Sequence, residues 1–360
     1  EEDAGRVSGR LYAISTAGSL VGTFLAALLL IPLAGTRRTF LAFALALALV
    51  AVLGLGRRRL VLAPAAIAAL LVIPAGTLKA TAGTARVIYE TETPYQYARV
   101  VQEPGGERQL ELNEGIAVHS LLRPHSYLTG GYWDEFLVLP FATASSPPRR
   151  LAILGNAAGT TARAYGHFFP RTQVDAVEID PALTRIGRRY FALRGPRLHT
   201  VAADARPFLE RSTRRYDTIL VDAYRQPYIP FYLATREFFA LVRAHLAPGG
   251  VMLVNVGHPS SSGSLERALA STAATVFPRV LTDAVATTNS ILVAGTGDPS
   301  ARRLRKAAAA LAPSLRPIAR AAASRLRPAR GGGPVWTDDR APVEWLIDES
   351  IVSYAARGGR

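Results

Sequence analysis

The sequence predicts an α/β protein with a doubly wound sheet, a small N-terminal β cap and preceding transmembrane helices. From about residue 150 onwards, strand patterns alternate with helix patterns, which is typical of a parallel sheet covered on both faces. The apolar strand Leu151–Gly155 leads into a turn of small residues, and the next strand ends in the acidic Glu178. The expected segments are transmembrane helices at 1–80, the β cap at 81–145, the sheet at 146–300, and an Arg/Ala-rich helical region with a C-terminal segment at 301–360.

The first 80 residues are predicted to form about three transmembrane helices. Three nearly uncharged stretches follow one another there, each about long enough, at roughly 20 residues, to cross a bilayer. Only Thr36–Arg38 and Arg57–Arg59 separate them, which argues against a signal peptide and against buried helices of a soluble protein. We expect them to be part of a larger membrane domain. The stretches are Leu11–Pro32, Phe40–Gly56 and Leu60–Gly76.

The formal net charge of +15 comes almost wholly from arginine. Part of it lies in the region Arg302–Arg330, which has no interleaved aromatic residues for base stacking. We therefore expect a solvated or lipid-facing helical surface there, and no nucleic acid. The chain has no cysteine, which excludes disulfides and cysteine catalysis, and its six histidines lack the spacing of a metal site. No metal is expected.

Residues 81–145 contain short alternating strands, which predict a small antiparallel cap. The expected strands are Arg86–Glu90, Tyr97–Gln102, Arg108–Asn113 and Ile116–Ser120.

The following domain is predicted to alternate strands and helices. Late in the chain, Arg279–Asp283 and Ser290–Ala294 can pair as an antiparallel edge, which favours a methyltransferase-type, Rossmann-like sheet over a dinucleotide-binding one. After the break at Gly331–Pro334, the segment Trp336–Ile347 is expected to fold back on the domain. The expected strands are 151–155, 174–179, 198–202, 217–222 and 250–256, and the helices are 159–168, 181–192, 205–213 and 234–246.

The carboxyl ends of these strands are the expected ligand site. Gly155 and Gly159 bracket a turn that lets a ligand approach the backbone, although Ala157 stands where a middle glycine is common. Glu178 is placed to accept hydrogen bonds from ribose hydroxyls, roughly 20 residues after the turn. The alternative is a βαβ unit that binds no nucleoside.

Two further acids end strands and each has two interpretations. Asp204 could accept the adenine amino group while the neighbouring backbone contacts the ring, or it could cap the helix that begins at Arg206. Asp222 could hold an amine and accept its proton as the amine becomes a nucleophile. It could equally be an inert strand end.

A set of motifs over roughly residues 85–345 occurs together in one known family. The motifs are Glu92–Gln96, the turn Gly155–Gly159, Glu178, Asp204–Ala205, Asp217–Asp222 with Pro227, and Thr337–Glu344. On these residues the chain resembles the spermidine synthase-like family of polyamine aminopropyltransferases. With Gly9–Tyr12 and the apolar stretches, it is similar to the membrane-fused branch of that family.

The resemblance implies a β cap on a Rossmann-like methyltransferase domain. It implies transfer of an aminopropyl group from decarboxylated S-adenosylmethionine to an amine or polyamine, with release of methylthioadenosine and with Asp222 as the base. The expected partners are the amine, the lipid bilayer and a second copy in a homodimer. We expect a multi-pass protein of the inner membrane with its soluble domain in the cytoplasm, where S-adenosyl nucleosides are found. The nucleoside would be held by Gln96, Gly155, Gly159, Glu178, Asp204 and Ala205.

Several positions depart from the family pattern. Ala158 replaces the acid of the turn, and Arg225 or Gln226 replaces the second acid of the loop after Asp222. These changes keep two other functions open: a different reaction on S-adenosylmethionine, such as methyl transfer, and a non-catalytic membrane protein that senses a nucleoside. The residues expected to line the acceptor side are Tyr95, His119, Tyr132, Asp134, Tyr224 and Gln226.

Overall fold

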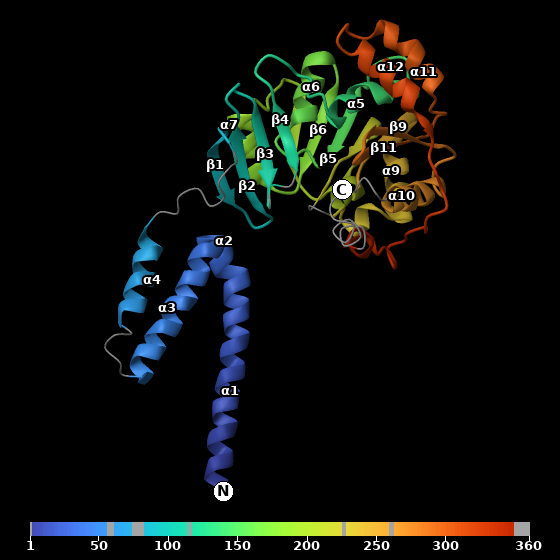
Figure 1. Cartoon of the computed structure of the whole chain (residues 1–360). Coiled ribbons are helices and arrows are strands. Elements are labelled where there is room, and N and C mark those ends of the chain that lie inside the picture. The colour runs from blue at the N-terminus through green and yellow to red at the C-terminus, as the bar shows by residue number, and fades with distance from the viewer. Residues whose placement is uncertain are drawn as a thin grey trace. The chain divides into compact units, whose positions relative to one another are not determined.

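A computed structural model of the chain describes residues 2–55, 61–73, 83–113, 115, 117–224, 228–258 and 263–348, with side chains from residue 5 (Figure 1). It divides into two compact units, Glu1–Arg99 and Val100–Arg360. Three residues of the predicted substrate loop, Arg225, Gln226 and Pro227, lie outside the described residues.

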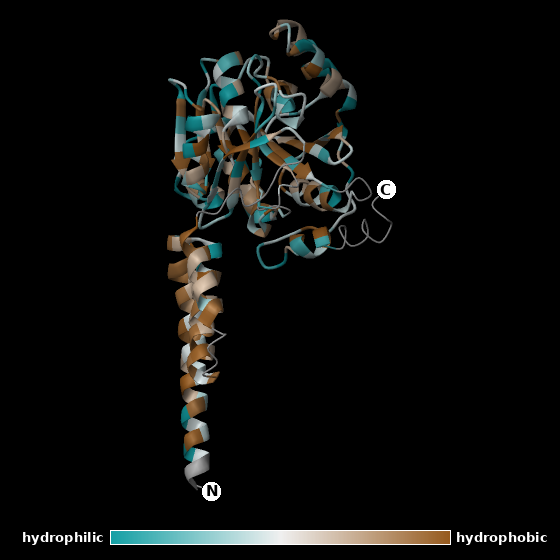
Figure 2. Ribbon diagram, turned by 60° about the vertical axis from the view of Figure 1, so that its left-hand side comes forward, coloured by the Kyte–Doolittle hydropathy of each residue, from teal (hydrophilic) through white to brown (hydrophobic). Residues whose placement is uncertain are grey.

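The first unit begins with helices that are mostly hydrophobic, apart from hydrophilic positions towards the N-terminus (Figure 2). By length and composition, Gly5–Ala34 and Thr36–Leu55 are each able to cross a membrane. The third predicted span is helical over the 11 residues Leu62–Val72. The helices are α1 (Glu2–Leu25), η1 (Ala26–Leu30), α2 (Ile31–Ala34), α3 (Thr36–Leu55) and α4 (Leu62–Val72).

Individual residues explain the π-helical turn before Pro32 and the start of α3. Pro32 has no N–H to donate, and just before it the N–H of Ile31 bonds to the oxygen of Ala26, five residues back, which gives the π-helical turn η1. At the start of α3, the N–H of Thr36 donates to a carboxylate oxygen of Glu92 at 2.6 Å. A carboxylate at a helix N-terminus stabilises unpaired N–H groups there.

Residues 86–122 form a four-stranded sheet in the order β1-β2-β3-β4, which confirms the predicted β cap. The boundary between the two units falls within β2, after Arg99. The β3–β4 pair is antiparallel, with Arg108 opposite Leu122. The strands are β1 (Arg86–Glu92), β2 (Tyr97–Gln102), β3 (Arg108–Leu112) and β4 (Val118–Leu122).

The second unit is built on an eight-stranded sheet in the order β12-β10-β11-β9-β8-β5-β6-β7. Strands β5 to β9 pair in parallel, and β11 lies antiparallel between β9 and β10. This placement confirms the predicted methyltransferase-type sheet. The strands are β5 (Arg150–Leu154), β6 (Gln173–Glu178), β7 (Leu198–Ala202), β8 (Tyr216–Val221), β9 (Leu246–Gly257), β10 (Val280–Ala286), β11 (Asn289–Gly295) and β12 (Arg327–Pro328).

Helices cover both faces of the sheet. Successive residues of β5 point to opposite faces, and both sets pack against helices. Ala152 and Leu154 pack with α8, α9, α10 and the C-terminal segment, whereas Leu151 and Ile153 pack with α5, α6, α11 and α12. The helices are α5 (Tyr132–Val138), α6 (Thr160–Phe168), α7 (Pro181–Tyr190), α8 (Ala205–Arg211), α9 (Arg236–His245), α10 (Ser264–Ala274), α11 (Ala301–Ala307) and α12 (Arg316–Arg325).

The C-terminal segment folds back on the domain, as predicted. Trp336 is buried in the core beside α9 and α10. Its backbone N–H donates to Thr272 Oγ1, and its backbone oxygen accepts from the N–H of Arg236. Asp338 then accepts two hydrogen bonds from the Arg206 guanidinium, at 2.8 and 2.6 Å.

A buried ion-pair cluster fastens α12 to the sheet. Arg325 donates to both carboxylate oxygens of Asp283 on β10, at 2.6 and 3.0 Å, and to Glu135 on α5 at 2.7 Å. Asp283 is fully buried, and burial raises the pKa of Glu135 to about 7. One arginine therefore joins three elements that are far apart in the sequence.

Replacing Arg325 with methionine should destabilise the second unit strongly. The change leaves two buried carboxyl groups without their cation, and breaking a buried pair from one side costs about 3–5 kcal/mol. Thermal unfolding of the purified protein measures the effect. The control is Arg320→Met, an exposed position on the same helix, where we expect a change within about 0.5 kcal/mol. Equal midpoints for the two variants would contradict this role of Arg325.

Candidate active site

The turn between β5 and α6 brings the backbone of two strand ends into close contact. Gly155 has φ +91°, and a Cβ there would lie 2.6 Å from the Cα of Ala223, just after β8. Gly159 has φ +92° and precedes the first residue of α6. Ala157 also takes a positive φ, +46°, which is uncommon for a residue with a side chain. The turn thus keeps the conformation of a glycine-rich loop despite the alanine.

Glu178 ends β6 directly beside this turn. Its carboxylate accepts hydrogen bonds from the N–H of Ala157 at 2.8 Å and from the N–H of Asp180 at 3.0 Å. The residue is 6% exposed, and burial raises its pKa to about 7. Each carboxylate oxygen can accept a further hydrogen bond, so the group can both hold the turn and contact a ligand.

Asn156 is a polar residue at this turn that sequence reasoning did not single out. It is 6% exposed, yet among the described residues neither its Nδ2 nor its Oδ1 has a hydrogen-bond partner. Buried amides are nearly always paired in native proteins. The sequence signal was an asparagine in a turn of small residues.

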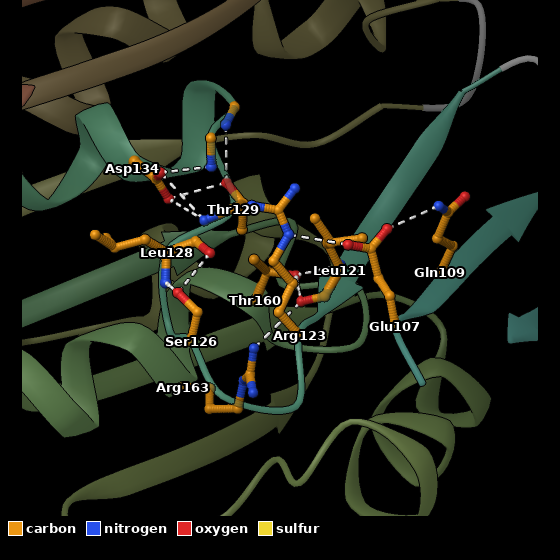
Figure 3. A network of polar contacts seen from close by, with 12 residues as sticks. Glu107, Gln109, Leu121, Arg123, Ser126, Leu128, Thr129, Asp134, Thr160 and Arg163 are labelled. Atoms are coloured by element: carbon orange, nitrogen blue, oxygen red, sulfur yellow. Dashed lines mark hydrogen bonds and ion pairs between the residues drawn. The ribbon is translucent and has the colours of Figure 1, made fainter. Parts of the chain in front are cut away.

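Strand β4 fastens the turn from its other side. The buried hydroxyl of Ser120 accepts from the N–H of Ala158 at 2.9 Å. Thr160 Oγ1 accepts from the N–H of Leu121 at 2.8 Å, and the Arg163 guanidinium donates to the oxygen of Leu121 at 3.3 Å (Figure 3). The cap strand and the first helix of the sheet domain are therefore tied together at the turn.

Asp222 lies at the end of β8, next to β5. Its carboxylate accepts from Asn255 Nδ2 at 2.8 Å and from the Tyr132 hydroxyl at 3.2 Å. Burial raises the pKa of Asp222 to about 7, while these two hydrogen bonds act to lower it. Asn255 is itself oriented by Asn289, whose Nδ2 donates to its Oδ1 at 3.0 Å.

Asn255 is a second residue that the sequence analysis missed. It is 4% exposed and sits in β9 between Val254 and Val256, both of which are buried in the core. A single amide within an otherwise apolar central strand was the available signal. Its Nδ2 contacts the carboxylate of Asp222, so it belongs to the site by direct contact.

Tyr132 and Tyr224 flank Asp222 but differ in their contacts. Burial raises the pKa of both tyrosines, so both hydroxyls stay protonated. The Tyr132 hydroxyl donates to Asp222. The Tyr224 hydroxyl donates to the oxygen of Asn255 at 2.9 Å and accepts from the N–H of Gly257 at 2.6 Å, which fastens the segment after β8 to the end of β9.

Asp204 caps helix α8, as one of the two sequence interpretations predicted. One carboxylate oxygen accepts from the N–H of Arg206 at 3.1 Å, and the other accepts from the Tyr232 hydroxyl at 2.7 Å. Ala205 is the buried first residue of the helix. Capping orders the carboxyl end of β7 without using every lone pair of Asp204.

Asp134 and His119 have mainly local contacts. The Asp134 carboxylate accepts from the N–H and hydroxyl of Thr129 and from the N–H of Gly130, and so orders the loop before α5 (Figure 3). Burial lowers the pKa of His119 to about 4, which leaves it neutral at pH 7. Its neutral Nδ1 lies 3.1 Å from the oxygen of Ala117.

Two other predicted site residues, Tyr95 and Gln96, have local contacts within their own unit. Tyr95 and Gln96 belong to the first unit, where their N–H groups both donate to Thr93 Oγ1 in the β1–β2 turn. Within the described ranges, no cluster of three His, Asp or Glu side chains is arranged to hold a metal ion.

The geometry provides two carboxyl groups at the same edge of the sheet, of which Glu178 is buried and Asp222 is partly exposed. Glu178 ends β6 and Asp222 follows β8, and both strands pair with β5, so the two acids flank the turn at Gly155. Each has its pKa raised to about 7 by burial. A carboxyl group with a pKa near neutrality is suited to general-base work.

Comparison with known proteins shows similarity to one family. Residues 135–296 match the spermine/spermidine synthase domain. A probable polyamine aminopropyl transferase of Bifidobacterium longum is 34% identical over 292 residues, covering 74% of this chain and 64% of the relative. A polyamine aminopropyltransferase of Vibrio vulnificus is 33% identical over 178 residues, covering 48% of this chain and 59% of the relative. The chain thus spans less than two thirds of the length of each.

A solved structure agrees with the fold. The crystal structure of a probable spermidine synthase from Corynebacterium glutamicum superposes with a TM-score of 0.54 at 20% identity, covering 71% of this chain and 98% of that one. The sequence matches and the shared fold confirm the resemblance that the motifs predicted. The chain is thus similar to spermidine synthase-like proteins, and its residues 135–296 match the spermine/spermidine synthase domain.

Proposed function

We propose that the chain is a membrane-anchored aminopropyltransferase. It would transfer the aminopropyl group of decarboxylated S-adenosylmethionine to an amine acceptor and release methylthioadenosine. The single observation that carries the proposal is the Asp222 carboxyl, with its pKa raised to about 7, held by Tyr132 and Asn255 at the carboxyl edge of the sheet. Relatives named as polyamine aminopropyltransferases support the reaction class.

The nucleoside of the donor would bind over the β5–α6 turn. Glu178 has spare lone pairs for two ribose hydroxyls, and the positive φ of Gly155 lets the ligand approach the backbone. The unpartnered amide of Asn156 is a polar group that a bound ligand or water would satisfy. Asp204 and Ala205 would face the adenine ring.

Asp222 would act as the base. In the proposed step, the acceptor nitrogen forms a bond to the aminopropyl carbon beside the sulfonium sulfur. The carbon–sulfur bond breaks, its electron pair goes to sulfur, and methylthioadenosine leaves. Asp222 takes the proton from the nitrogen. A base with a pKa near 7 is deprotonated in a large fraction of molecules at neutral pH and remains a useful proton acceptor.

We propose that the acceptor side of the site fits putrescine poorly. The turn carries Ala158 where the family has an acid, and Arg225 or Gln226 follows Asp222 where a second acid is expected. A dicationic amine is attracted less by a site with fewer carboxylates, and a nearby arginine repels it. A monoamine, or an amine that also bears a carboxylate for Arg225, would suit this charge pattern better.

A second candidate is methyl transfer from S-adenosylmethionine. The observation that favours it is the alanine at position 158, because no carboxylate in the turn would then repel the carboxylate of the donor. The two donors differ only by that carboxylate. Their relative affinities therefore separate the two reactions.

We expect Glu178→Gln to weaken nucleoside binding at least tenfold at pH 8, where the carboxyl is ionised. Hydrogen bonds to a charged acceptor contribute roughly 1.5–3 kcal/mol each, and tenfold corresponds to about 1.4 kcal/mol. Isothermal titration with decarboxylated S-adenosylmethionine, S-adenosylmethionine and methylthioadenosine measures it. For the unmodified protein, tighter binding of the decarboxylated donor supports aminopropyl transfer, and tighter binding of the carboxylated one supports methyl transfer. An unchanged dissociation constant in folded Glu178→Gln would rule out nucleoside binding at this site.

Asp222→Asn should abolish amine transfer while leaving nucleoside affinity within a few fold. Loss of a general base commonly costs about 10² to 10⁴ in rate, and the ribose contacts are made elsewhere. Methylthioadenosine release with a panel of amines is the measurement, and Glu178→Gln is the matched control that should lose affinity first. Equal rates for Asp222→Asn and the unmodified protein would exclude Asp222 as the base. Robust turnover of putrescine would contradict the proposed effect of the missing acids.

The membrane anchor is proposed from the helices Gly5–Ala34 and Thr36–Leu55. Few of their residues are buried within the described part of the chain, so most of their apolar side chains remain exposed or only partly covered. We expect the full chain to stay with membranes after alkaline carbonate extraction, because apolar helices of this length are held by the bilayer core. Recovery of the whole chain in the supernatant without detergent would show that these helices do not span a membrane.

A further inference from the structure

Helices α11 and α12 carry a cationic surface that the proposed reaction does not use. Leu304, Ala308, Ala319 and Ala322 are buried against the sheet domain. Many of the exposed positions of the same segment are basic, and the others are Ala, Pro or Ser. We call them the α11–α12 basic face, which comprises Arg302, Arg303, Arg305, Lys306, Arg316, Arg320, Arg327 and Arg330.

This face has an unusual charge balance. Residues 301–336 contain nine arginines and lysines and no aspartate or glutamate. Arg325 is the ninth and points inward to Asp283 and Glu135. For the other eight, the structure records no ion pair with a carboxylate in the part of the chain that it describes. Among the described residues, these eight exposed basic side chains therefore have no internal counter-charge.

Such a distribution costs helix stability unless a partner supplies negative charge. Arg302 and Arg305 are three residues apart on α11, as are Arg303 and Lys306, and Arg316 and Arg320 are four apart on α12. Like charges at these spacings are neighbours on a helix surface and repel each other. An anionic partner would offset this repulsion, because each basic side chain is attracted to it.

Two further observations decide which anionic partner fits. No aromatic residue occurs between residues 301 and 335, so the face lacks the stacking groups with which proteins hold single-stranded nucleic acid. The chain also carries two helices long and apolar enough to cross a membrane. Clusters of arginine and lysine in membrane-bound chains are attracted to anionic headgroups.

We propose that the α11–α12 basic face binds the anionic phospholipid headgroups of the membrane in which the chain is anchored. The proposal rests on the membrane anchor of the proposed function but not on the transferase reaction. The occupant is a lipid surface, recognised by charge rather than by a shaped pocket. Arg302 and Arg303 lie in the first turn of α11 and contribute to the face without taking part in the site around Asp222.

The absence of cysteine allows a single-label test in the full chain. A fluorophore is attached at Ser314→Cys, an exposed position between α11 and α12, and at Thr213→Cys as an exposed control after α8. The protein is placed in nanodiscs of phosphatidylcholine with and without phosphatidylglycerol. We expect quenching of the Ser314→Cys label by a soluble quencher to fall about twofold with phosphatidylglycerol and to recover at high salt, since headgroup attraction is screened. The Thr213→Cys label should not respond.

A charge reversal identifies the residues responsible. Arg302→Glu with Arg303→Glu should remove most of the protection, and glutamate at the first turn of a helix is compatible with folding. The matched control is Arg185→Glu with Arg188→Glu, two exposed arginines on α7, which should leave the protection unchanged. Quenching that is equal in both kinds of disc would overturn the proposal. Protection produced by RNA, but not by phosphatidylglycerol, would also overturn it and assign the face to nucleic acid.

Failure of the anchor gives a different result. A chain that does not enter nanodiscs refutes the membrane part of the proposed function, and flotation of the same chain with vesicles then decides the headgroup proposal. Binding to phosphatidylglycerol vesicles, lost in Arg302→Glu with Arg303→Glu, supports it. Equal behaviour with phosphatidylglycerol and phosphatidylcholine vesicles overturns it.

Discussion

The candidate site depends on the hydrogen bonds that the buried carboxylate of Glu178 accepts. It accepts the N–H groups of Ala157 and Asp180, and so fixes the left-handed turn between β5 and α6 relative to the end of β6. Burying the group costs free energy, which is why its pKa rises to about 7. The folded state then binds a proton more tightly than the unfolded chain, and the stability that this group contributes falls as the pH rises towards 7. In the proposed function, this turn is already shaped for the nucleoside before the nucleoside binds.

The Asp222 carboxylate is also partly removed from water, but different partners stabilise it. The neutral donors Tyr132 and Asn255 partly compensate for the lost water. Because Asn289 orients the amide of Asn255, the carboxylate is held by residues from α5, β9 and β11. If Asp222 acts as the proposed base, this rigid positioning reduces the entropic cost of reaching the transition state. The antiparallel β11, which marks the methyltransferase-type sheet, thereby reaches the site.

The Arg/Ala-rich region combines two roles that its composition alone does not separate. Alanine and leucine on one side of α11 and α12 pack on the sheet, and Arg325 joins them to Asp283 and Glu135. The remaining basic residues are exposed on the other side. A buried ion pair contributes little net stability but is costly to break, so it fixes where the helices dock. The exposed charge is then presented in a defined orientation.

The sequence by itself determined the features that depend on neighbouring residues. Strand and helix periodicity predicted the parallel sheet and its antiparallel β10–β11 pair, and the positions of Glu178 and Asp222 at strand ends followed from the same pattern. Contacts between distant segments were decided only by the tertiary structure. The Asn255 amide at Asp222 and the inward-facing Arg325 each join residues more than 30 positions apart. Local patterns carry no information about such pairs, because only the packing of helices and strands brings them within hydrogen-bond distance.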